Sequence, residues 1–228
     1  MKTYIALLAY NHYDLTLKRL YELMRHCILD VDCIYVINNG STDETHEGLR
    51  WWKNPDNVRM RVKEIRLEEN LGFLLGANYG LRTIAKNAQP DDLIVLLSND
   101  VQITGNFIPE LAKNNDGKRR LYGGKFLYQD TGWNKFGDKL FAYLEGWILA
   151  TTKAGWETLG YFDERFAPND YEDIDLTATA VDLGFELVEV GHGKLFHQGG
   201  GTLGYTPERL EQTNRNKKKF EQKWLKRE

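Results

Sequence analysis

Four acidic side chains lie within the six residues from Asp170 to Asp175, directly before an apolar segment that predicts a helix over Leu176–Leu183. The helix dipole favours negative charge at a helix N-terminus, which accounts for Glu172 or Asp173. It does not account for four carboxylates in so short a stretch. The cluster is therefore also a candidate site.

A further carboxylate, Asp100, follows an apolar run. A turn begins at Pro90, and the five apolar residues Leu93–Leu97 then predict a central parallel strand covered on both faces. The strand runs into Ser98 and Asn99 before it reaches Asp100. Ligands of open α/β sheets bind outside the carboxyl ends of the strands, where a carboxylate can hold a divalent cation and, through it, a diphosphate. The competing interpretation is a polar turn without a ligand.

One histidine has a comparable position. His197 comes shortly after a predicted strand over Phe185–Val190 and just before the three glycines Gly199–Gly201. A single histidine is more often structural than a metal ligand. A histidine at a strand end beside a glycine-rich loop is better placed than most to reach a bound group.

The elements that would position these residues alternate between strands and helices. Unbroken apolar runs predict the strands, and apolar residues at helical spacing predict the helices between them. Strand–helix–strand units of this kind form parallel sheets with right-handed crossovers. The predicted strands are Tyr4–Ala9, Cys33–Ile37, Val62–Leu67 (nearer the sheet edge) and Leu93–Leu97, and the helices pass through Leu15–Met24, Leu49–Trp52 and Gly72–Ile84.

After Asp100 the pattern changes to short strands, a short helix over Lys153–Leu159, and loops. The strands are predicted over Leu121–Tyr128, Lys139–Tyr143 and Trp147–Ala150. Earlier in the chain, Gly72, Gly76 and Gly80 recur every four residues. They favour either close packing of a helix on the sheet or the approach of a ligand, and the sequence leaves both open.

Composition and charge limit the class of protein. The chain has 228 residues, 42% of them hydrophobic, and a formal net charge of −3, which does not suit a nucleic-acid polycation. Cys27 and Cys33 fit no zinc motif and are expected to be reduced thiols. The apolar run near the N-terminus is too short for a signal peptide, and none approaches the ~20 residues of a membrane span. We therefore expect a cytoplasmic protein.

The end of the chain is basic. Thr213–Glu228 holds seven Lys and Arg against two Glu, together with Phe220, Trp224 and Leu225. Thr206 and Pro207 are typical of a helix start. Such a helix suits peripheral contact with an anionic membrane or with another polyanion, such as nucleic acid; the alternative is that its apolar residues pack on the domain.

Taken together, these residues resemble family 2 of the inverting nucleotide-sugar glycosyltransferases, and within it the rhamnosyltransferase-like branch. The resemblance covers Tyr4 to Gly201, and four motifs carry it in the family's order. They are Ala9-Tyr10-Asn11; Asn38–Thr45, similar to D-(D/N)-G-S-T-D-x-T; Asn70–Gly80, similar to N-x-G-F-x-x-G-x-N-x-G; and Gly160–Phe166 with Tyr171–Leu176, similar to G-x-F-D-E-x-F and x-E-D-x-D-L. The last is the strongest single signal.

The resemblance implies an α/β protein with the GT-A fold, in which helices flank a mostly parallel, Rossmann-like central sheet and a small antiparallel part follows the metal-binding strand. Residues 1–205 would form the glycosyltransferase domain, with a nucleotide-binding half (1–100) and an acceptor and catalytic half (101–205). Residues 206–228 would form the basic C-terminal helix.

The implied activity is metal-dependent transfer of a sugar, with inversion, from a nucleotide-diphosphate sugar to an acceptor hydroxyl. By motif position, Asp173 is the catalytic base, with Glu172 as the competing candidate. Asp100 and His197 are ligands of a divalent cation, Mn²⁺ or Mg²⁺. The donor-binding positions are Tyr10, Asn11, Asn38, Asp43, Asn70, Gly72, Asn78, Ser98 and Asn99, and Trp147 either stacks on a sugar or belongs to the core.

One position departs from the family pattern. Asn38 stands where relatives have an aspartate that accepts a hydrogen bond from a uracil or thymine ring N–H, and an asparagine can donate as well as accept. A UDP- or dTDP-sugar is the expected donor. The sequence does not indicate the acceptor or the oligomeric state.

Two other classes of protein are alternatives. A nucleotidyltransferase acting on sugar phosphates would need a glycine-rich loop with a basic residue after the first strand, which Tyr10-Asn11-His12 does not provide. A catalytically silent nucleotide-sugar-binding module would not need Asp100, Asp173 and His197.

Overall fold

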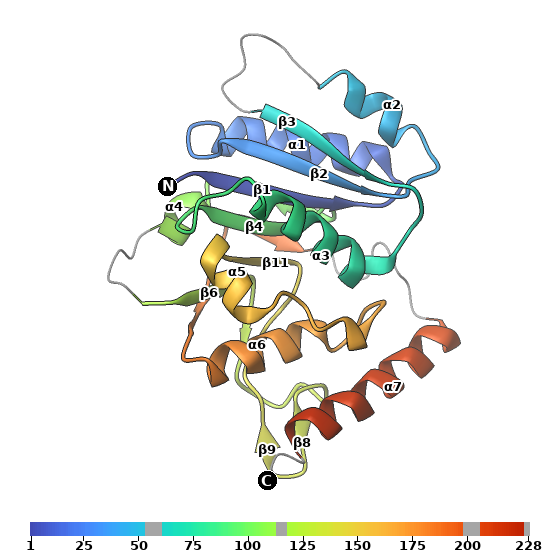
Figure 1. Ribbon diagram of the computed structural model, residues 1–228, viewed down its shortest axis with the longest axis vertical. Coiled ribbons are helices and arrows are strands. Elements are labelled where there is room, and N and C mark those ends of the chain that lie inside the picture. Colours follow the sequence, from blue (N-terminus) through green and yellow to red (C-terminus); the bar gives the residue numbers. More distant parts are fainter. Residues whose placement is uncertain (53–60, 113–117, 198–205, 226–228) are drawn as a thin grey trace.

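The computed structural model describes residues 1–52, 61–112, 118–197 and 206–225. Its largest sheet has seven strands in the order β12-β6-β11-β4-β1-β2-β3 (Figure 1). These strands are β1 (Thr3–Ala9), β2 (Cys33–Asn39), β3 (Arg61–Leu67), β4 (Leu93–Ser98), β6 (Arg120–Gly123), β11 (Ile148–Thr152) and β12 (Glu186–Glu189).

The sheet is mostly parallel. Strand β1 pairs in parallel with β2 and β4, and β3 extends the sheet in parallel at one edge, as the sequence predicted. Strand β11 runs antiparallel to both β4 and β6, so the antiparallel part follows the Asp100 strand. The predicted fold class is confirmed. Both halves of the chain contribute strands to this one sheet.

Helices cover both faces of the sheet, which explains the unbroken apolar strands. Side chains of β1 alternate between two cores: Tyr4, Ala6 and Leu8 face one, and Ile5 and Leu7 face the other. Helices α3 (Gly72–Ala85), α5 (Lys153–Leu159), α6 (Glu172–Asp182) and α7 (Pro207–Trp224) contribute to the first core, and α1 (Tyr13–Cys27), α2 (Thr45–Arg50) and α4 (Ile108–Ala112) to the second.

The glycines of α3 serve packing. A Cβ atom at Gly80 would lie 2.0 Å from Cδ1 of Ile37, and one at Gly76 would lie 2.8 Å from Nδ2 of Asn39. Both neighbours belong to β2, so the glycines let α3 lie close against that strand. Gly72 begins the helix with φ +80°, a backbone conformation that favours glycine.

Several local predictions differ from the structure. The strand predicted over Leu121–Tyr128 is divided into β6 and β7 (Phe126–Leu127) because the backbone turns at Gly124, where a Cβ would lie 2.0 Å from the Trp147 ring. The helix predicted from Leu176 begins at Glu172. The segment before His197 is a strand, β13 (Leu195–His197), antiparallel to β5 (Val101–Ile103). The remaining short elements are β8 (Lys135–Phe136), β9 (Lys139–Leu140), β10 (Tyr143–Leu144) and the 3₁₀ turn η1 (Glu164–Phe166).

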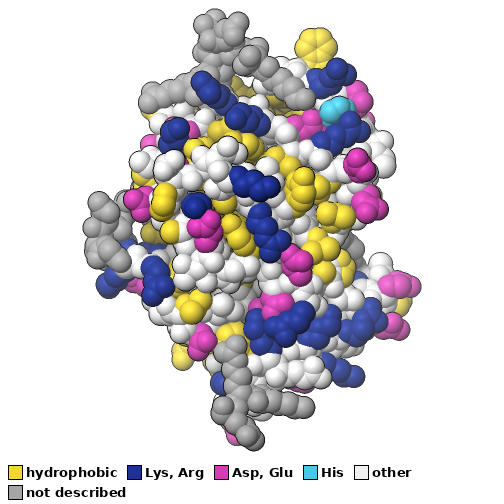
Figure 2. Space-filling model, in the orientation of Figure 1, with side chains coloured by type: hydrophobic (Ala, Val, Ile, Leu, Met, Phe, Trp, Pro, Cys, Tyr) yellow, Lys and Arg dark blue, Asp and Glu magenta, His cyan; other side chains and the backbone are white. Residues whose placement is uncertain are grey.

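The C-terminal helix α7 packs on the domain. Phe220 and Trp224, two of the three apolar residues considered for a membrane-facing surface, are buried, while Leu225 is 39% exposed. Figure 2 shows Lys and Arg side chains gathered over α7, so its outer surface is basic. No helix in the part of the chain that the structure describes is both long and apolar enough to cross a membrane.

Candidate active site

The loops that follow β1 and β2 are tied together by residues predicted to hold the donor. The backbone N–H of Asn11 donates to Oγ of Ser41 (2.9 Å), and Oδ1 of Asn11 accepts from the N–H of Thr42 (2.8 Å). Asp43 accepts from the N–H of Tyr13 (3.1 Å). These bonds fix the shape of the carboxyl edge of the sheet, where Tyr10 lies half-buried.

Asn38 is fully buried, and its partners define the orientation of its amide. Its Oδ1 accepts from the backbone N–H of Ser41 (3.0 Å), and its Nδ2 donates to Oε1 of Glu64 (2.8 Å). The same carboxylate contacts Nδ1 of His46 (2.9 Å). Sequence reasoning missed Glu64 and His46, since neither belongs to a motif. The register of β3 on β2 sets Glu64 opposite Val36, and its carboxylate reaches Asn38 two residues further along β2.

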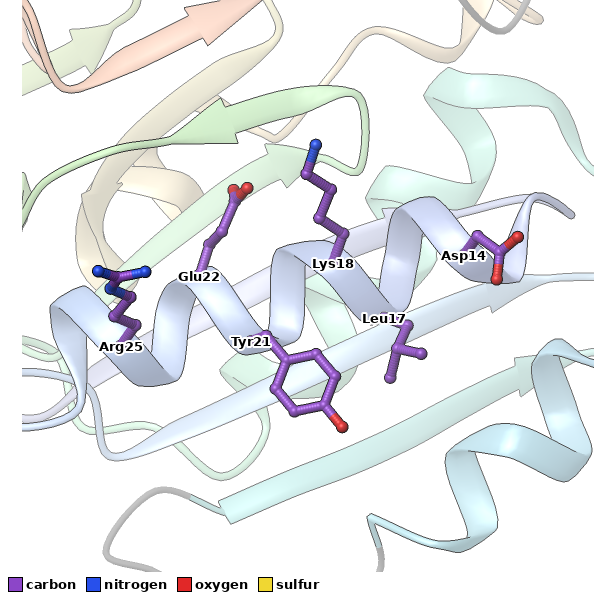
Figure 3. Close-up of a pocket in the computed structure, with 6 residues that line it drawn as sticks. All are labelled: Asp14, Leu17, Lys18, Tyr21, Glu22 and Arg25. Carbon is purple, nitrogen blue, oxygen red and sulfur yellow. The ribbon is translucent and has the colours of Figure 1, made fainter.

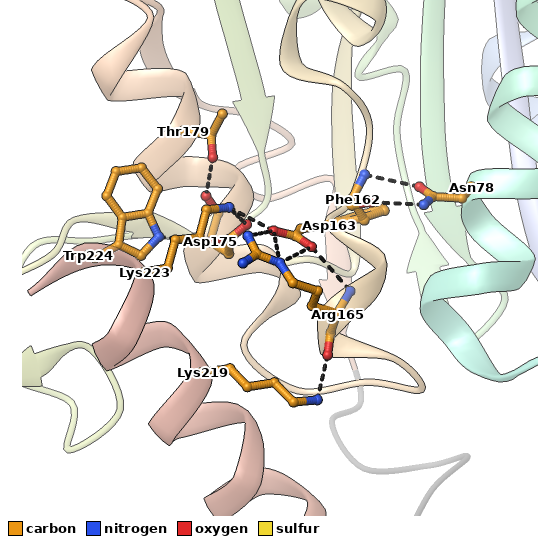
Figure 4. A network of polar contacts seen from close by, with 9 residues as sticks. All are labelled: Asn78, Phe162, Asp163, Arg165, Asp175, Thr179, Lys219, Lys223 and Trp224. Carbon is orange, nitrogen blue, oxygen red and sulfur yellow. Dashed lines mark hydrogen bonds and ion pairs between the residues drawn. The ribbon is translucent and has the colours of Figure 1, made fainter. Parts of the chain in front are cut away.

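The asparagines of the third motif have structural partners. Oδ1 of Asn70 accepts from Nδ2 of Asn39 (3.0 Å) and from the N–H of Gly72 (2.9 Å). Asn78 is buried; its Nδ2 donates to the carbonyl of Phe162 (2.9 Å), and its Oδ1 accepts from the N–H of Phe162 (3.0 Å; Figure 4). Asn78 therefore joins α3 to the segment before η1, a role that needs no contact with a donor.

Asp100 and His197, far apart in the sequence, meet through the pairing of β5 with β13. His197 lies opposite Val101 in that pair, and its Nε2 is 3.4 Å from Oδ2 of Asp100. Oδ1 of Asp100 is buried and has no hydrogen-bond partner among the described residues. A carboxylate oxygen without a partner beside an imidazole nitrogen fits a divalent cation that accepts oxygen and nitrogen ligands. Gly199–Gly201 lie outside the described residues.

The residues around Asp100 are anchored to α1. Nδ2 of Asn99, which is buried, donates to Oγ1 of Thr16 (3.2 Å). Nη1 of the buried Arg19 donates to the carbonyl of Val101 (2.7 Å). Sequence reasoning missed Arg19 because an arginine in an amphipathic helix is usually exposed.

The indole ring of Trp147 contacts three neighbouring residues, His197, Glu145 and Gly124. Its ring stacks on the imidazole of His197 (centroids 5.6 Å apart, planes 17° apart), and its Nε1 donates to Oε2 of Glu145 (2.7 Å). The Gly124 backbone lies close under the ring. The backbone carbonyl of Trp147 accepts from the N–H of Ser98 (3.0 Å), which attaches Trp147 to the end of β4. One face of the indole is thus occupied by a histidine, not left open for a sugar.

The turn Glu145–Trp147 also contacts the acidic cluster, through the backbone of Gly146. The N–H of Gly146 donates to Oδ2 of Asp173 (3.2 Å), and the N–H of Ile174 donates to Oδ1 (2.8 Å). Asp173 is half-buried, and burial raises the pKa of its carboxyl to about 6, with the two N–H groups opposing the shift. The carboxylate therefore binds protons more tightly than an exposed aspartate does.

The other three acids of the cluster have different surroundings. Glu172 is buried with Oε2 unpartnered among the described residues, and burial together with the charge of Asp173 raises its pKa well above the usual range. Asp170 pairs with Arg209 (2.9 Å). Asp175 is buried and pairs with Lys223 (2.7 Å).

A hollow of about 310 Å³ lies elsewhere, on the outer surface of α1 (Figure 3). All its lining residues come from this helix, and none is a candidate site residue; they are Asp14, Leu17, Lys18, Tyr21, Glu22 and Arg25. The chemistry-bearing residues therefore gather at the carboxyl edge of the sheet and not in this hollow.

This architecture defines an α/β protein with a largely parallel sheet, and the candidate site residues lie at the carboxyl edge of that sheet. The family is defined by the sequence: residues 4–176 match the model of Glycosyl transferase family 2, and the chain belongs to this family. No curated protein matches the sequence.

Three solved structures share the fold at low sequence identity. A mannosyltransferase, PcManGT from Pyrobaculum calidifontis in complex with GDP-Man and Mn²⁺, has 17% identity and a TM-score of 0.60 over 82% of this chain and 54% of its own. GalNAc-T7 with UDP, GalNAc and Mn²⁺ has 14% sequence identity and a TM-score of 0.68; the match covers 98% of this chain and 49% of the GalNAc-T7 chain. S. aureus TarS 1–349 with UDP-GlcNAc has 16% sequence identity and a TM-score of 0.61; the match covers 95% of this chain and 65% of the TarS chain. The chain thus spans less than two thirds of each.

Proposed function

We propose that this protein transfers a sugar from a nucleotide-diphosphate sugar to an acceptor hydroxyl, with inversion and with the help of a divalent cation. One observation carries the proposal. The turn Glu145–Trp147 contacts both the proposed base and the proposed cation ligands. Gly146 donates to Asp173, and Trp147 stacks on His197, which lies beside Asp100. A base and a cation site held by one turn suit a reaction in which a hydroxyl attacks while a diphosphate leaves.

Asp100 and His197 would hold the cation, Mn²⁺ or Mg²⁺. When bound, it neutralises charge on the leaving diphosphate. The described residues contain no group of three or more His, Cys, Asp or Glu side chains that could hold a metal, so donor oxygens and water would complete the coordination. The presence of Mn²⁺ with PcManGT and with GalNAc-T7 supports this assignment.

Asp173 is the residue that takes the proton of the acceptor hydroxyl. Its carboxylate is partly accessible, and its Oδ2 is fixed by the N–H of Gly146. The linked loops at Asn11 and Asp43 would frame the donor nucleotide, with Tyr10 beside them. The branch of rhamnosyltransferase-like enzymes and a UDP- or dTDP-sugar donor are part of this proposal, and the structure in complex with GDP-Man keeps guanine as the alternative base.

The rate of transfer should depend on pH through Asp173. Burial raises the pKa of this carboxyl from 3.8 to about 6, so below about pH 6 the base is protonated and cannot accept a proton. We expect the turnover number at saturating donor to rise about tenfold per pH unit up to about pH 6 and then to level off. Stopped-time assays between pH 4.5 and 8.5 measure this. A flat profile across that interval would contradict the assignment.

Trp147 should act on the cation site. Replacing Trp147 by leucine removes the ring that stacks on His197, and groups that orient a metal-binding histidine typically change metal affinity by about tenfold or more. We expect weaker Mn²⁺ binding in Trp147→Leu, measured by electron paramagnetic resonance of free Mn²⁺. Trp51→Leu, at a tryptophan that is 88% exposed, is the matched control. Equal Mn²⁺ affinity in a folded Trp147→Leu variant would show that the stack does not matter.

The test of the function itself is a screen of nucleotide sugars with and without Mn²⁺. A donor that binds the native state raises its melting temperature. Release of a nucleoside diphosphate in the presence of an acceptor mixture supports the transferase. Release of pyrophosphate from a nucleoside triphosphate and a sugar phosphate would support the nucleotidyltransferase instead, and binding without turnover would support a silent binding module.

A peripheral membrane contact remains a separate prediction for the basic outer surface of α7. Sedimentation with anionic vesicles at low and high salt measures it. Because Phe220 and Trp224 are buried, charge alone would drive such binding, and 1 M salt should abolish it. Absence of sedimentation at low salt would contradict the prediction.

A further inference from the structure

The turn that leads into α6 has an unusual backbone. Asp170 and Tyr171 have φ values of 70° and 74°, and Tyr171 directly precedes the helix. A bulky aromatic residue rarely adopts this left-handed conformation, which persists only where the surrounding structure holds it. Asp173 lies in the first turn of α6, so the position of its carboxylate depends on what holds Tyr171.

Helix α7 holds the backbone of this turn. Asn216 of α7 is fully buried, and its Nδ2 lies 2.6 Å from the carbonyl oxygen of Phe166, 2.8 Å from that of Asn169 and 2.9 Å from that of Asp170. The two N–H groups of one amide thus lie within hydrogen-bond distance of three carbonyl oxygens, one N–H being shared between two of them, and these oxygens would otherwise lose hydrogen bonds on burial. No other residue type of this size offers two N–H donors at that point.

The same helix holds the Asp170 side chain. Nη2 of Arg209 is 2.9 Å from Oδ1 of Asp170, and Oγ1 of Thr213 donates to Oδ2 (2.6 Å). The ring of Tyr171 also packs against Phe220 of α7, with centroids 5.8 Å apart. Side chain and backbone of the turn are therefore both attached to α7.

A second attachment lies on the other side of Asp173. Asp175 is buried, and its carboxylate accepts from Nζ of Lys223 and from Nε1 of Trp224, both at 2.7 Å. Lys223 also bonds to Asp163, so the network reaches the segment before η1 (Figure 4). Contacts from α7 thus flank Asp173 on both sides in the sequence.

We propose that α7 is a positioning element for Asp173, with Asn216 as its central residue. This inference rests on the proposed function, in which Asp173 is the base. We call the contacts of α7 with Asp170, Tyr171 and Asp175 the brace. Helix α7 begins at residue 207, beyond the matched residues 4–176, so the brace lies outside the family match. Several of its polar and basic side chains are engaged in holding the turn and Asp175.

The central test compares Asn216→Ala with Asn214→Ala, an exposed asparagine on the same helix. In Asn216→Ala, we expect the turnover number for nucleoside diphosphate release to fall at least about tenfold, because small displacements of a catalytic group are costly. The affinity for uridine diphosphate with Mn²⁺ should stay within about twofold. Amide hydrogen exchange in residues 169–176 should accelerate, and Asn214→Ala should match the wild type in all three measurements.

A second pair guards against failure of Asn216→Ala to fold. Arg209→Met removes a partly exposed ion pair with Asp170, while Arg215→Met changes an arginine that contacts Glu211 and Gln212 of the same helix. We expect faster exchange in residues 169–176 and a displaced pH midpoint of turnover for Arg209→Met only.

The outcomes separate this inference from the proposed function. If Asp173→Asn is inactive but folded Asn216→Ala and Arg209→Met keep wild-type turnover, pH midpoint and hydrogen exchange, the positioning role is wrong and the function stands. If Asp173→Asn is fully active, the proposed base is wrong. In that case, unchanged exchange in Asn216→Ala also overturns the brace, and accelerated exchange supports it as a structural clamp on this turn.

Discussion

Replacing Asp173 by asparagine is expected to lower turnover by at least about a hundredfold, while affinity for the nucleotide sugar stays close to normal. Asparagine preserves the size of the side chain but cannot take the proton of the attacking hydroxyl, and a positioned general base contributes roughly 10²–10⁴-fold. Its amide oxygen can still accept the Gly146 N–H. Steady-state kinetics and calorimetric donor binding measure the two effects separately.

Glu172→Gln is the matched control for this prediction. Adjacent residues in a helix point about 100° apart, so only one of the two carboxylates can face the acceptor. Glu172 is 8% exposed and Asp173 is half-buried, which gives Asp173 the better access. If Glu172→Gln lost all activity and Asp173→Asn kept the wild-type turnover, the base would be Glu172.

Replacing Asp100 by alanine is expected to abolish the Mn²⁺-dependent part of donor binding while the protein stays folded. Asp100 lies two residues after β4, and its Oδ1 has no hydrogen-bond partner among the described residues, so its removal breaks no hydrogen bond to that atom. Isothermal titration of uridine diphosphate with and without Mn²⁺ measures the loss, and circular dichroism checks the fold.

His197→Ala is expected to weaken Mn²⁺ affinity less, because it removes one ligand of several. Thermal unfolding of both variants should resemble that of the wild type. Undiminished Mn²⁺-dependent turnover in Asp100→Ala would refute the cation site. A loss confined to His197→Ala would shift the assignment of the main ligand from Asp100 to the histidine.

The central sheet could be predicted because its strands are covered on both faces. Leu93–Leu97 and Tyr4–Ala9 are unbroken apolar runs, and such runs report burial directly. The pairing of β5 with β13 could not be predicted, since each strand has three residues and the pair joins positions more than ninety residues apart. Periodicity needs longer segments than these.

For the site, the motifs indicated candidate residues but not what each one contacts. Asn78 was expected at the donor, yet its amide is bonded to Phe162, a partner that only the fold brings near. The acidic cluster read as one group, but burial separates Glu172 and Asp175 from Asp173. A local sequence pattern carries no information on such long-range contacts.

The position of α7 in the chain also has a consequence for how the protein is made. Synthesis proceeds from the N-terminus, and domains begin to fold while the chain is still growing. The strands β1 to β4 are complete at Ser98, about 120 residues before Asn216 is translated. We therefore expect a nascent chain to form the linked loops after β1 and β2 first, to complete the cation site once His197 is made, and to gain an ordered Asp173 only when α7 emerges.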